Sequence, residues 1–129
     1  MDTVADLITR IKNANRAGKG AVTAPYSKMG LSIAELLERE GFVRAVRIKE
    51  RKNVRILDIA LLKDAAGRPR VCGALRVSKP SRRQYFGVRK VRPVKHGGGR
   101  LVISTPKGIM TGEEAKKTGV GGEPLFIIW

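Results

Sequence analysis

The chain is short of several residue types, and each shortage excludes a class of protein. Its 129 residues include one cysteine, Cys72, so neither a disulfide framework nor a cysteine-ligated metal cluster is expected. Aromatic residues make up only 5%, which argues against extensive stacking on bases. His96 is the only histidine, and no motif sets it beside a nucleophile, a base or metal ligands. We therefore expect no enzyme activity, no cofactor and no metal, with His96 in a loop and Cys72 as a small buried hydrophobe.

Long apolar runs are also missing. No run approaches the roughly 18 residues that a membrane-spanning helix needs. The first residues include Asp2 and Asp6 and lack the apolar core of a signal peptide. We therefore expect a cytoplasmic protein without a membrane partner. A hydrophobic content of 42% is enough for a core, which excludes a fully disordered basic tail.

Acidic residues are absent from a long stretch of the second half. Between Ala65 and Gly112 the chain has twelve lysine or arginine residues and no aspartate or glutamate. Residues 1–64 hold 13 basic and 8 acidic groups (+5), whereas residues 65–129 hold 14 and 3 (+11), which together give the net charge of +16. A surface so one-sided needs a polyanion beside it. The second half therefore has the charge of a nucleic-acid-binding face.

Apolar spacing and capping signals predict two helices in the first half. Apolar side chains recur at helical spacing over residues 4–14, and Thr3 with Asp6 resembles a capping box. A second helix is predicted from Ser27, a good N-cap, to Gly41, which suits the C′ position.

The remainder of the first half is expected to be extended. A short strand should cover residues 21–24. Residues 42–49 and 54–62 should pair as a hairpin, with a charged turn at residues 49–53.

Residues 63–70 combine small residues with glycine and proline, and we expect them to separate a lobe of residues 1–64 from a lobe of residues 65–129. Strands dominate the second lobe, with one helix that opens at Thr111 in a capping box, TGEE, and stops at Gly119. The fold class is α+β: a small α/β N-terminal lobe (helix, strand, helix, hairpin) and a mainly β C-terminal lobe with one short helix. The strands of the second lobe are expected at residues 71–77, 85–88, 101–104 and 125–129.

A basic loop over residues 76–92 is the first candidate site. Phosphate contact needs cations at fixed positions, and arginine adds a fork that grips phosphate with two hydrogen bonds. A solvated charge run is the alternative, but the missing acids favour phosphate contact. The loop begins at Arg76 and contains Lys79, Arg82, Arg83, Arg89, Lys90 and Arg92.

The second candidate is the corner STPKG at residues 104–108, directly after an expected strand. Ser104 and Thr105 carry hydroxyls that both donate and accept, which suits sugar 2′-OH groups and base edges. Lys107 adds a cation and Gly108 a flexible backbone. The alternative is plain turn chemistry, which Ser-Thr-Pro sequences commonly supply.

The third candidate is the segment GVGGE at residues 119–123. Gly121 and Gly122 would let another backbone approach closely. Glu123 could accept a base amino proton, orient an arginine or pair with a lysine across the sheet. The run of glycines at residues 97–99 lacks the pattern of a phosphate-binding loop, so we reject a nucleoside-triphosphate site.

Six stretches in order make the chain resemble the bacterial small-subunit ribosomal protein S-eight family over nearly all its length. They are DLITRIKNA (6–14), PYSK (25–28), EGF (40–42), RVSKP (76–80), IST through GIMT (103–111) and GVGGE (119–123). The resemblance implies an α/β lobe packed on a mainly β lobe. It also implies direct binding to the central domain of small-subunit rRNA early in assembly, beside neighbouring ribosomal proteins. Binding to the message of its own operon, as a translational repressor, is a further implication.

The resemblance also implies which residues contact RNA. The main RNA-reading loop falls on Ser104, Thr105 and Lys107, with support from Tyr85 and Glu123. Further contacts are expected at Gly108, Gly121, Gly122, Lys79, Arg82 and Arg83, and in the N-terminal lobe at Thr9, Arg10, Asn13, Ser27 and Lys28.

Three positions depart from the family pattern. Pro106 replaces a usual second serine, so one hydroxyl contact is missing and the loop is expected to be stiffer. Ser81 replaces a usual glycine. Pro124 stands where a β-branched residue is common, which suggests an edge position or a displaced strand start.

The residues alone leave other functions open. A stand-alone repressor of messenger RNA would use the same surface. An RNA-processing enzyme would need the cluster of histidine, cysteine or aspartate that the sequence lacks. A DNA compactor would bind duplex DNA as well as structured RNA.

Overall fold

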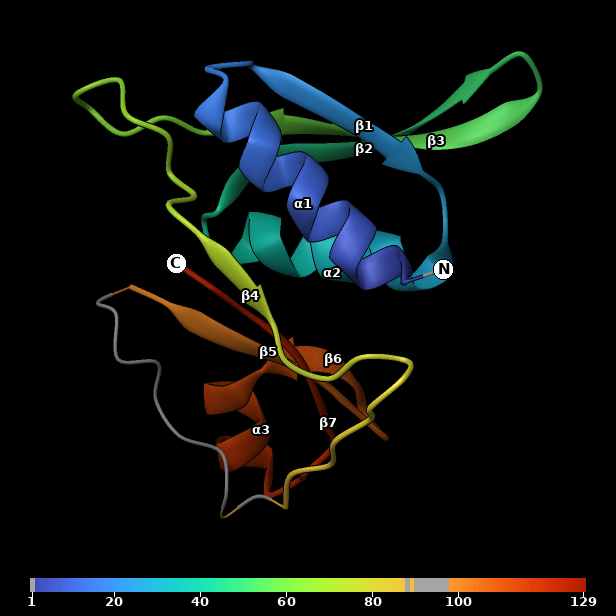
Figure 1. Cartoon of the computed structure of the whole chain (residues 1–129), viewed down its shortest axis with the longest axis vertical. Coiled ribbons are helices and arrows are strands. Elements are labelled where there is room, and N and C mark those ends of the chain that lie inside the picture. The colour runs from blue at the N-terminus through green and yellow to red at the C-terminus, as the bar shows by residue number, and fades with distance from the viewer. Residues whose placement is uncertain (1, 88, 90–97) are drawn as a thin grey trace. The chain divides into compact units, whose positions relative to one another are not determined.

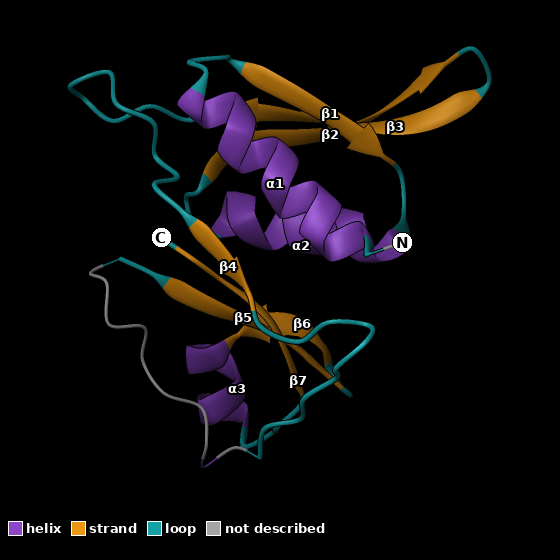
Figure 2. Cartoon of the chain, viewed as in Figure 1, coloured by secondary structure: helices purple, strands orange, loops and turns teal. Residues whose placement is uncertain are grey.

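The computed structural model describes residues 2–87, 89 and 98–129. The described part of the chain is α+β, as predicted, with three helices and two antiparallel sheets (Figures 1 and 2). None of these helices is long and apolar enough to cross a bilayer. The predicted features that lie outside the described residues are Val88 of the strand at 85–88, the cations Lys90 and Arg92, the loop histidine His96, and Gly97.

The chain divides into two compact units, one of Thr3–Cys72 and one of Gly73–Trp129 together with Asp2. The N-terminal unit is a three-stranded sheet, in the order β1-β3-β2, with two helices on one of its faces (Figure 1). Both strand pairings are antiparallel. The elements are α1 (Thr3–Arg16), β1 (Ala21–Pro25), α2 (Lys28–Arg39), β2 (Val43–Arg51) and β3 (Val54–Leu61).

The core of the N-terminal unit forms where the apolar face of the sheet meets the helices. Side chains alternate along β3, so Leu57, Ile59 and Leu61 are buried while the residues between them stay partly exposed. From α2, Ile33 and Leu37 are fully buried. Each such side chain contributes roughly 1.5–3 kcal/mol by leaving water. The side chains on the opposite face of the sheet are partly or fully exposed to solvent.

The ends of α2 lie where its capping residues predict them. The Ser27 hydroxyl accepts a hydrogen bond from the backbone N–H of Gly30 at 2.9 Å, and Gly41 follows the helix with φ = 80°. The prediction for α1 is wrong in detail. That helix begins at Thr3 itself, and the Asp6 carboxylate pairs with Arg10 at 2.9 Å instead of capping the helix.

The hairpin between β2 and β3 is tighter than predicted. Strand β2 continues to Arg51 and β3 begins at Val54, so the turn is Lys52 and Asn53 rather than residues 49–53. Both turn residues have positive φ, 52° and 63°, as a type I′ turn requires. The end of β2 escaped prediction because lysine and glutamate are uncommon in strands.

Residues 63–70 fold back as a loop of the N-terminal unit. The N–H of Arg70 donates to the carbonyl of Leu62 at 3.0 Å, and its guanidinium lies 4.3 Å from the centre of the Phe42 ring. The compact unit therefore ends after this loop, at Cys72.

Cys72 is exposed, so the expectation of a buried thiol is wrong. The predicted strand at residues 71–77 covers only Ala74–Arg76, and the pairing just before it joins Gly73 to Trp129. Val71 is buried and belongs to the N-terminal unit. The apolar run VCGAL therefore spans the end of one unit and the start of the next, and Cys72 belongs to neither core.

The C-terminal unit is a four-stranded antiparallel sheet in the order β4-β7-β5-β6. Helix α3 packs on β5, where Leu101, Ile103 and Ala115 form a small apolar cluster. The helix opens at Thr111 in a capping box and ends at Gly119 with φ = 75°, as predicted. The elements are β4 (Ala74–Arg76), β5 (Arg100–Thr105), β6 (Gly108–Thr111), α3 (Gly112–Thr118) and β7 (Glu123–Ile128).

The last strand, β7, is one of the two interior strands of this sheet. It pairs with β4 on one side and β5 on the other, so an edge position for Pro124 is wrong. Pro124 is the second residue of β7, beside a register shift between Val102 and Ile103, where a residue without an N–H is tolerated.

Two other strand predictions need correction. Among the described residues, 85–87 form no strand: Phe86 makes only an isolated bridge to Gly122. Strand β6 was not predicted, because its four residues open with a glycine and are too few to show an alternating pattern.

Candidate nucleic-acid interface

A hollow of about 420 Å³ opens on the C-terminal unit where three segments meet. The segments are the loop 85–87, the end of β5 with the turn that follows, and the start of β7. The hollow unites six residues that the sequence predicted as RNA contacts. It is lined by Tyr85, Phe86, Gly87, Ser104, Thr105, Pro106, Gly121, Gly122 and Glu123.

Two glycines allow these segments to meet. A Cβ at Gly121 would overlap the carbonyl oxygen of Phe86, and a Cβ at Gly122 would overlap that of Ser104. The backbone of Gly122 also exchanges two hydrogen bonds with Phe86, at 2.8 and 2.9 Å. The predicted close approach is therefore present, and the approaching backbones belong to the chain itself. Only glycine fits at either position.

The two hydroxyls of the corner have different roles. Thr105 Oγ1 donates to the carbonyl of Gly108 at 2.8 Å and accepts from the N–H of Lys107 at 3.1 Å, so it closes the β5–β6 turn. The turn chemistry left open by the sequence accounts for this residue. The Ser104 hydroxyl, in contrast, has no hydrogen-bond partner among the described residues. Ser104 is therefore the hydroxyl that can bond to a ligand.

Lys107 lies in the β5–β6 turn and Gly108 begins β6, and both are outside the lining of the hollow. Lys107 is exposed, and Gly108 has φ = 119°, a conformation that side-chain-bearing residues rarely adopt. The turn thus carries one cation beside the hollow.

Glu123 is held by two side chains. Ser78 Oγ donates to Glu123 Oε2 at 2.5 Å, and Arg83 Nη1 lies 3.6 Å from Oε1. Ser78 is completely buried and also accepts from the N–H of Gln84 at 3.0 Å. Of the roles proposed for Glu123, the one seen in the geometry is the orientation of an arginine. Its side chain is only 15% exposed, so it binds the basic turn to β7.

The basic turn ahead of the hollow is a closed unit. Lys79 and Arg82 bond to each other through both backbone groups, at 3.2 and 2.9 Å. The side chains of Lys79, Arg82 and Arg83 are exposed. Because Gln84 is fixed by Ser78, these cations are presented at defined positions next to Tyr85, whose ring is 69% exposed.

The predicted contacts of the N-terminal unit form no single cluster. Arg10 and Asn13 line a groove between α1 and β1. Arg10 is also used internally, since it pairs with Asp6 and donates to the carbonyl of Thr23 at 3.1 Å. Ser27 caps α2, while Thr9 and Lys28 are exposed.

Sequence reasoning missed four residues of this region as contacts. Phe86, Gly87 and Pro106 line the hollow, and Ser78 bonds to Glu123, which also lines it. Ser78 directly precedes Lys-Pro at the end of an apolar strand, and a serine in that place is a candidate for a buried residue that caps the turn. Its partner Glu123, however, is 45 residues away in the sequence. Among the described residues, no three histidine, cysteine, aspartate or glutamate side chains gather to hold a metal ion.

Comparison with known proteins assigns nearly the whole chain to one family. The sequence matches the family Ribosomal protein S8 over residues 2–129. It is similar to the small ribosomal subunit protein uS8 of Azoarcus sp. (strain BH72), with 40% identity over 127 residues that cover 98% of this chain and 96% of that protein. The uS8 proteins of Paracidovorax citrulli (43%, 98% and 96% covered) and Roseiflexus castenholzii (41% over 128 residues, 99% and 97% covered) are similarly related. The chain therefore belongs to the ribosomal protein S8 family, as its motifs predicted.

Proposed function

We propose that this chain is a structural component of the small ribosomal subunit. It binds the central domain of small-subunit rRNA directly, supports assembly in the cytoplasm and contacts neighbouring ribosomal proteins. The observation that carries the proposal is the hollow that joins Tyr85, Ser104 and Glu123 beside an exposed cationic turn. Membership of a ribosomal protein family supports the same function.

The chemistry of the hollow suits an irregular A-form helix. Such a helix offers 2′-OH groups and base edges in a wide, shallow minor groove. The Ser104 hydroxyl can donate to one of these groups and accept from another. The exposed ring of Tyr85 offers a flat surface to an unstacked base or a ribose. Lys79, Arg82 and Lys107 would contact phosphates, which fixes the register of the RNA without reading its sequence.

In the N-terminal unit we propose looser contacts with the RNA backbone. Thr9 and Lys28 are exposed and can reach a phosphate. Asn13 borders the groove between α1 and β1. Arg10 and Ser27 act mainly within the protein, so removing their side chains should affect the fold as well as binding.

The test compares two kinds of variant in filter-binding titrations over a salt series. Ser104→Ala should lower the preference for the cognate helix over a random helix by about threefold to tenfold, the value of one hydrogen bond. Arg82→Ala should weaken binding to both RNAs alike and reduce the salt slope by about 1. Equal losses on both helices for Ser104→Ala would contradict RNA reading at this hollow.

The same surface would accept a helix of matching shape in the message of the chain's own operon. Repression by this route needs no second site, because one hollow would bind either RNA. A translational reporter that carries the operon leader tests this role. Repression that survives in Ser104→Ala and Arg82→Ala would contradict it.

A further inference from the structure

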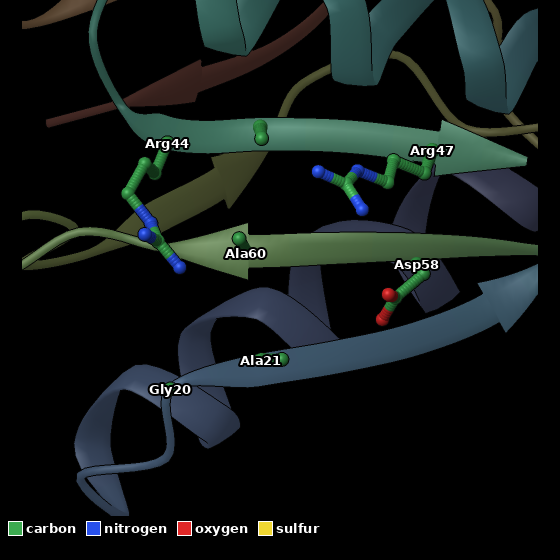
Figure 3. A pocket seen from close by; sticks show the side chains of 7 residues that line it. Gly20, Ala21, Arg44, Arg47, Asp58 and Ala60 are labelled. Carbon is green, nitrogen blue, oxygen red and sulfur yellow. The ribbon is translucent and has the colours of Figure 1, made fainter.

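The N-terminal sheet has a second face that no element of its unit covers. Helices α1 and α2 pack on the face that carries Leu57 and Ile59. The open face carries the alternate residues, and a hollow of about 290 Å³ lies on it between β1, β2 and β3 (Figure 3). This face is distinct from the predicted N-terminal RNA contacts.

Small side chains form the floor of this hollow. Ala21, Ala60 and Ala45 lie side by side in register across the three strands. In Figure 3 the guanidinium groups of Arg44 and Arg47 lie on either side of Ala60. A flat floor with long cations beside it leaves room for the backbone of a ligand.

A β-bulge turns Arg44 toward this face. The register of β2 against β3 shifts between Val43 and Ala45, so Arg44 is an extra residue in the strand. Bulges commonly re-aim a side chain in this way. Arg44 is exposed and lines the hollow. Without the bulge, the strict alternation of side chains along a strand would place Arg44 on the face opposite Ala45.

Three further cations follow on the same face of β2. Arg47, Lys49 and Arg51 are alternate residues, so their side chains share one face at a spacing of about 7 Å. All are exposed. Glu50 falls on the other face by the same alternation. With Arg44 these residues form a cationic column, Arg44, Arg47, Lys49 and Arg51.

The carboxylate of Asp58 lies on this face and neutralises one of the four cations of the column, Lys49. Asp58 is bonded to Lys49, whose Nζ lies 3.0 Å from Asp58 Oδ2. Arg44 and Arg47 have no hydrogen bond or ion pair with other described residues. Both guanidinium groups therefore keep their full donor capacity for a ligand.

We propose that the cationic column and its alanine floor bind the phosphodiester backbone of an RNA segment. A regular row of cations suits a polymer with one negative charge on every unit, whereas a protein partner would need a matching row of carboxylates. The floor of the hollow has no aromatic ring on which a base could stack, and no other side chain joins the arginines in reading base edges. We therefore expect binding here to be independent of the RNA sequence. The inference rests on the proposed function, because that function makes RNA the ligand. It adds a site on the N-terminal unit to the hollow on the C-terminal unit.

The experiment uses the full chain and three variants. Arg44→Ala/Arg47→Ala removes the two unpaired cations. Arg16→Ala/Lys63→Ala, the matched control, removes two exposed cations of the same unit away from the face. Arg44→Lys/Arg47→Lys keeps the charge and removes the forked geometry. Each is titrated over a salt series against a central-domain rRNA transcript, a fluorescent oligouridylate and a fluorescent oligoglutamate, and circular dichroism checks that each remains folded.

For Arg44→Ala/Arg47→Ala we expect the salt slope to fall by about 2 on the transcript and by about 1.4 on the oligouridylate. The control should keep the wild-type slopes, and the lysine variant should keep most of its slope. Slopes equal to those of the control on both RNAs would overturn the proposal. So would a loss confined to binding of oligoglutamate, which would assign the face to an acidic protein. If the wild-type chain fails to prefer the central-domain transcript, the proposed function falls, while the oligouridylate titration still decides this site.

Discussion

The two units differ in how they use buried polar groups. The N-terminal unit is held by apolar packing, and its one buried polar side chain, Asn15, has an amide nitrogen without a partner in the described residues. In the C-terminal unit Ser78 and Thr111 are equally buried, but each makes hydrogen bonds that fix a loop or a helix start. Burial of a polar group is costly unless it is bonded. The C-terminal unit therefore uses its polar core to position loops.

The two units also differ in how their acidic and basic side chains pair. Three aspartates of the N-terminal unit pair with nearby exposed cations: Asp6 with Arg10, Asp58 with Lys49 and Asp64 with Arg68. In the C-terminal unit, Asp2 pairs with Arg76 at 2.9 Å, and Glu123 orients Arg83 from a mostly buried position. The exposed cations Lys79, Arg82 and Lys107 have no ion pair with other described residues and remain available to a polyanion. The difference predicts that C-terminal substitutions near the hollow affect both the fold and RNA binding.

The largest effect is expected from Gly122→Ala. The added Cβ would overlap the Ser104 carbonyl oxygen, which belongs to backbone in a paired strand and cannot move freely. We expect a loss of about 3 kcal/mol or more in the free energy of unfolding, at the upper end for overpacking. Urea denaturation followed by circular dichroism measures it.

The matched control is Gly20→Ala in the N-terminal unit. A Cβ there meets nothing within 4 Å, and its φ is not positive. Its unfolding free energy should stay within about 0.5 kcal/mol of wild type or rise slightly, because alanine restricts the unfolded chain. Similar losses at both glycines would show that close backbone approach does not distinguish the hollow.

The next effect in size is that of Ser78→Ala. Removing the hydroxyl leaves the Glu123 carboxylate and the Gln84 N–H without this buried partner. We expect a loss of about 1–3 kcal/mol in unfolding free energy, the cost of unsatisfied buried groups. Binding to the cognate helix should fall as well, because the basic turn is no longer fixed. Ser81→Ala, in the exposed part of the same turn, should change neither quantity, and a Ser78→Ala protein that binds and unfolds like it would contradict this role.

Local signals allowed much of the fold to be predicted from sequence. Ser27, Gly41, Thr111 and Gly119 mark helix ends because capping depends on residues three or four positions away. The apolar run at residues 125–129 predicted strand β7, but not its place between β4 and β5. What failed was non-local: Cys72 stands where two cores divide the chain, and no local pattern records that division.

The candidate site shows the same limit. Residue types pointed to Ser104 and Glu123, and the fold brings both to one hollow with Tyr85. The different roles of Ser104 and Glu123 could not be predicted, because they depend on contacts between residues that are distant in sequence. Ser78 bonds to Glu123 across 45 residues, and only the strand register brings them together. Thr105 closing its own turn was foreseeable, and the sequence left that alternative open.

A smaller effect compares the two helix caps. Ser27→Ala removes one acceptor for the Gly30 N–H, at the partly buried start of α2. Thr111→Ala removes the hydroxyl of a reciprocal capping box in which the residue itself is buried. We expect losses of about 1 kcal/mol for Ser27→Ala and nearer 2 kcal/mol for Thr111→Ala. Thermal denaturation of both variants measures the difference, and the reverse order would contradict the role given to buried polar groups in the C-terminal unit.

The smallest effect is a local response to pH in the loop at Asp64. The N–H of Arg68 donates to Asp64 Oδ1 at 2.9 Å, and this bond is the main reason that the pKa of Asp64 lies below its ordinary value of 3.8. Desolvation, the next effect in size, raises this pKa, while the Ala66 N–H and the Arg68 side chain lower it further. Because the folded pKa is depressed, the stabilisation of the loop is fully present above the ordinary value and is lost as the pH falls through the folded pKa.

Amide chemical shifts of Ala66 and Arg68 should therefore change together below pH 3.8, with a midpoint under that value. In Asp64→Asn this change should disappear, while the amides near Ser78 serve as a reference within the same sample. A midpoint at or above 3.8 would mean that the loop hydrogen bonds do not hold the carboxylate. Because Asp64 lies at the surface, its protonation should leave the rest of the unit folded, in contrast to the loss expected from Ser78→Ala. The exposed charges of the N-terminal unit would then act locally, and the buried polar contacts of the C-terminal unit would act on the site as a whole.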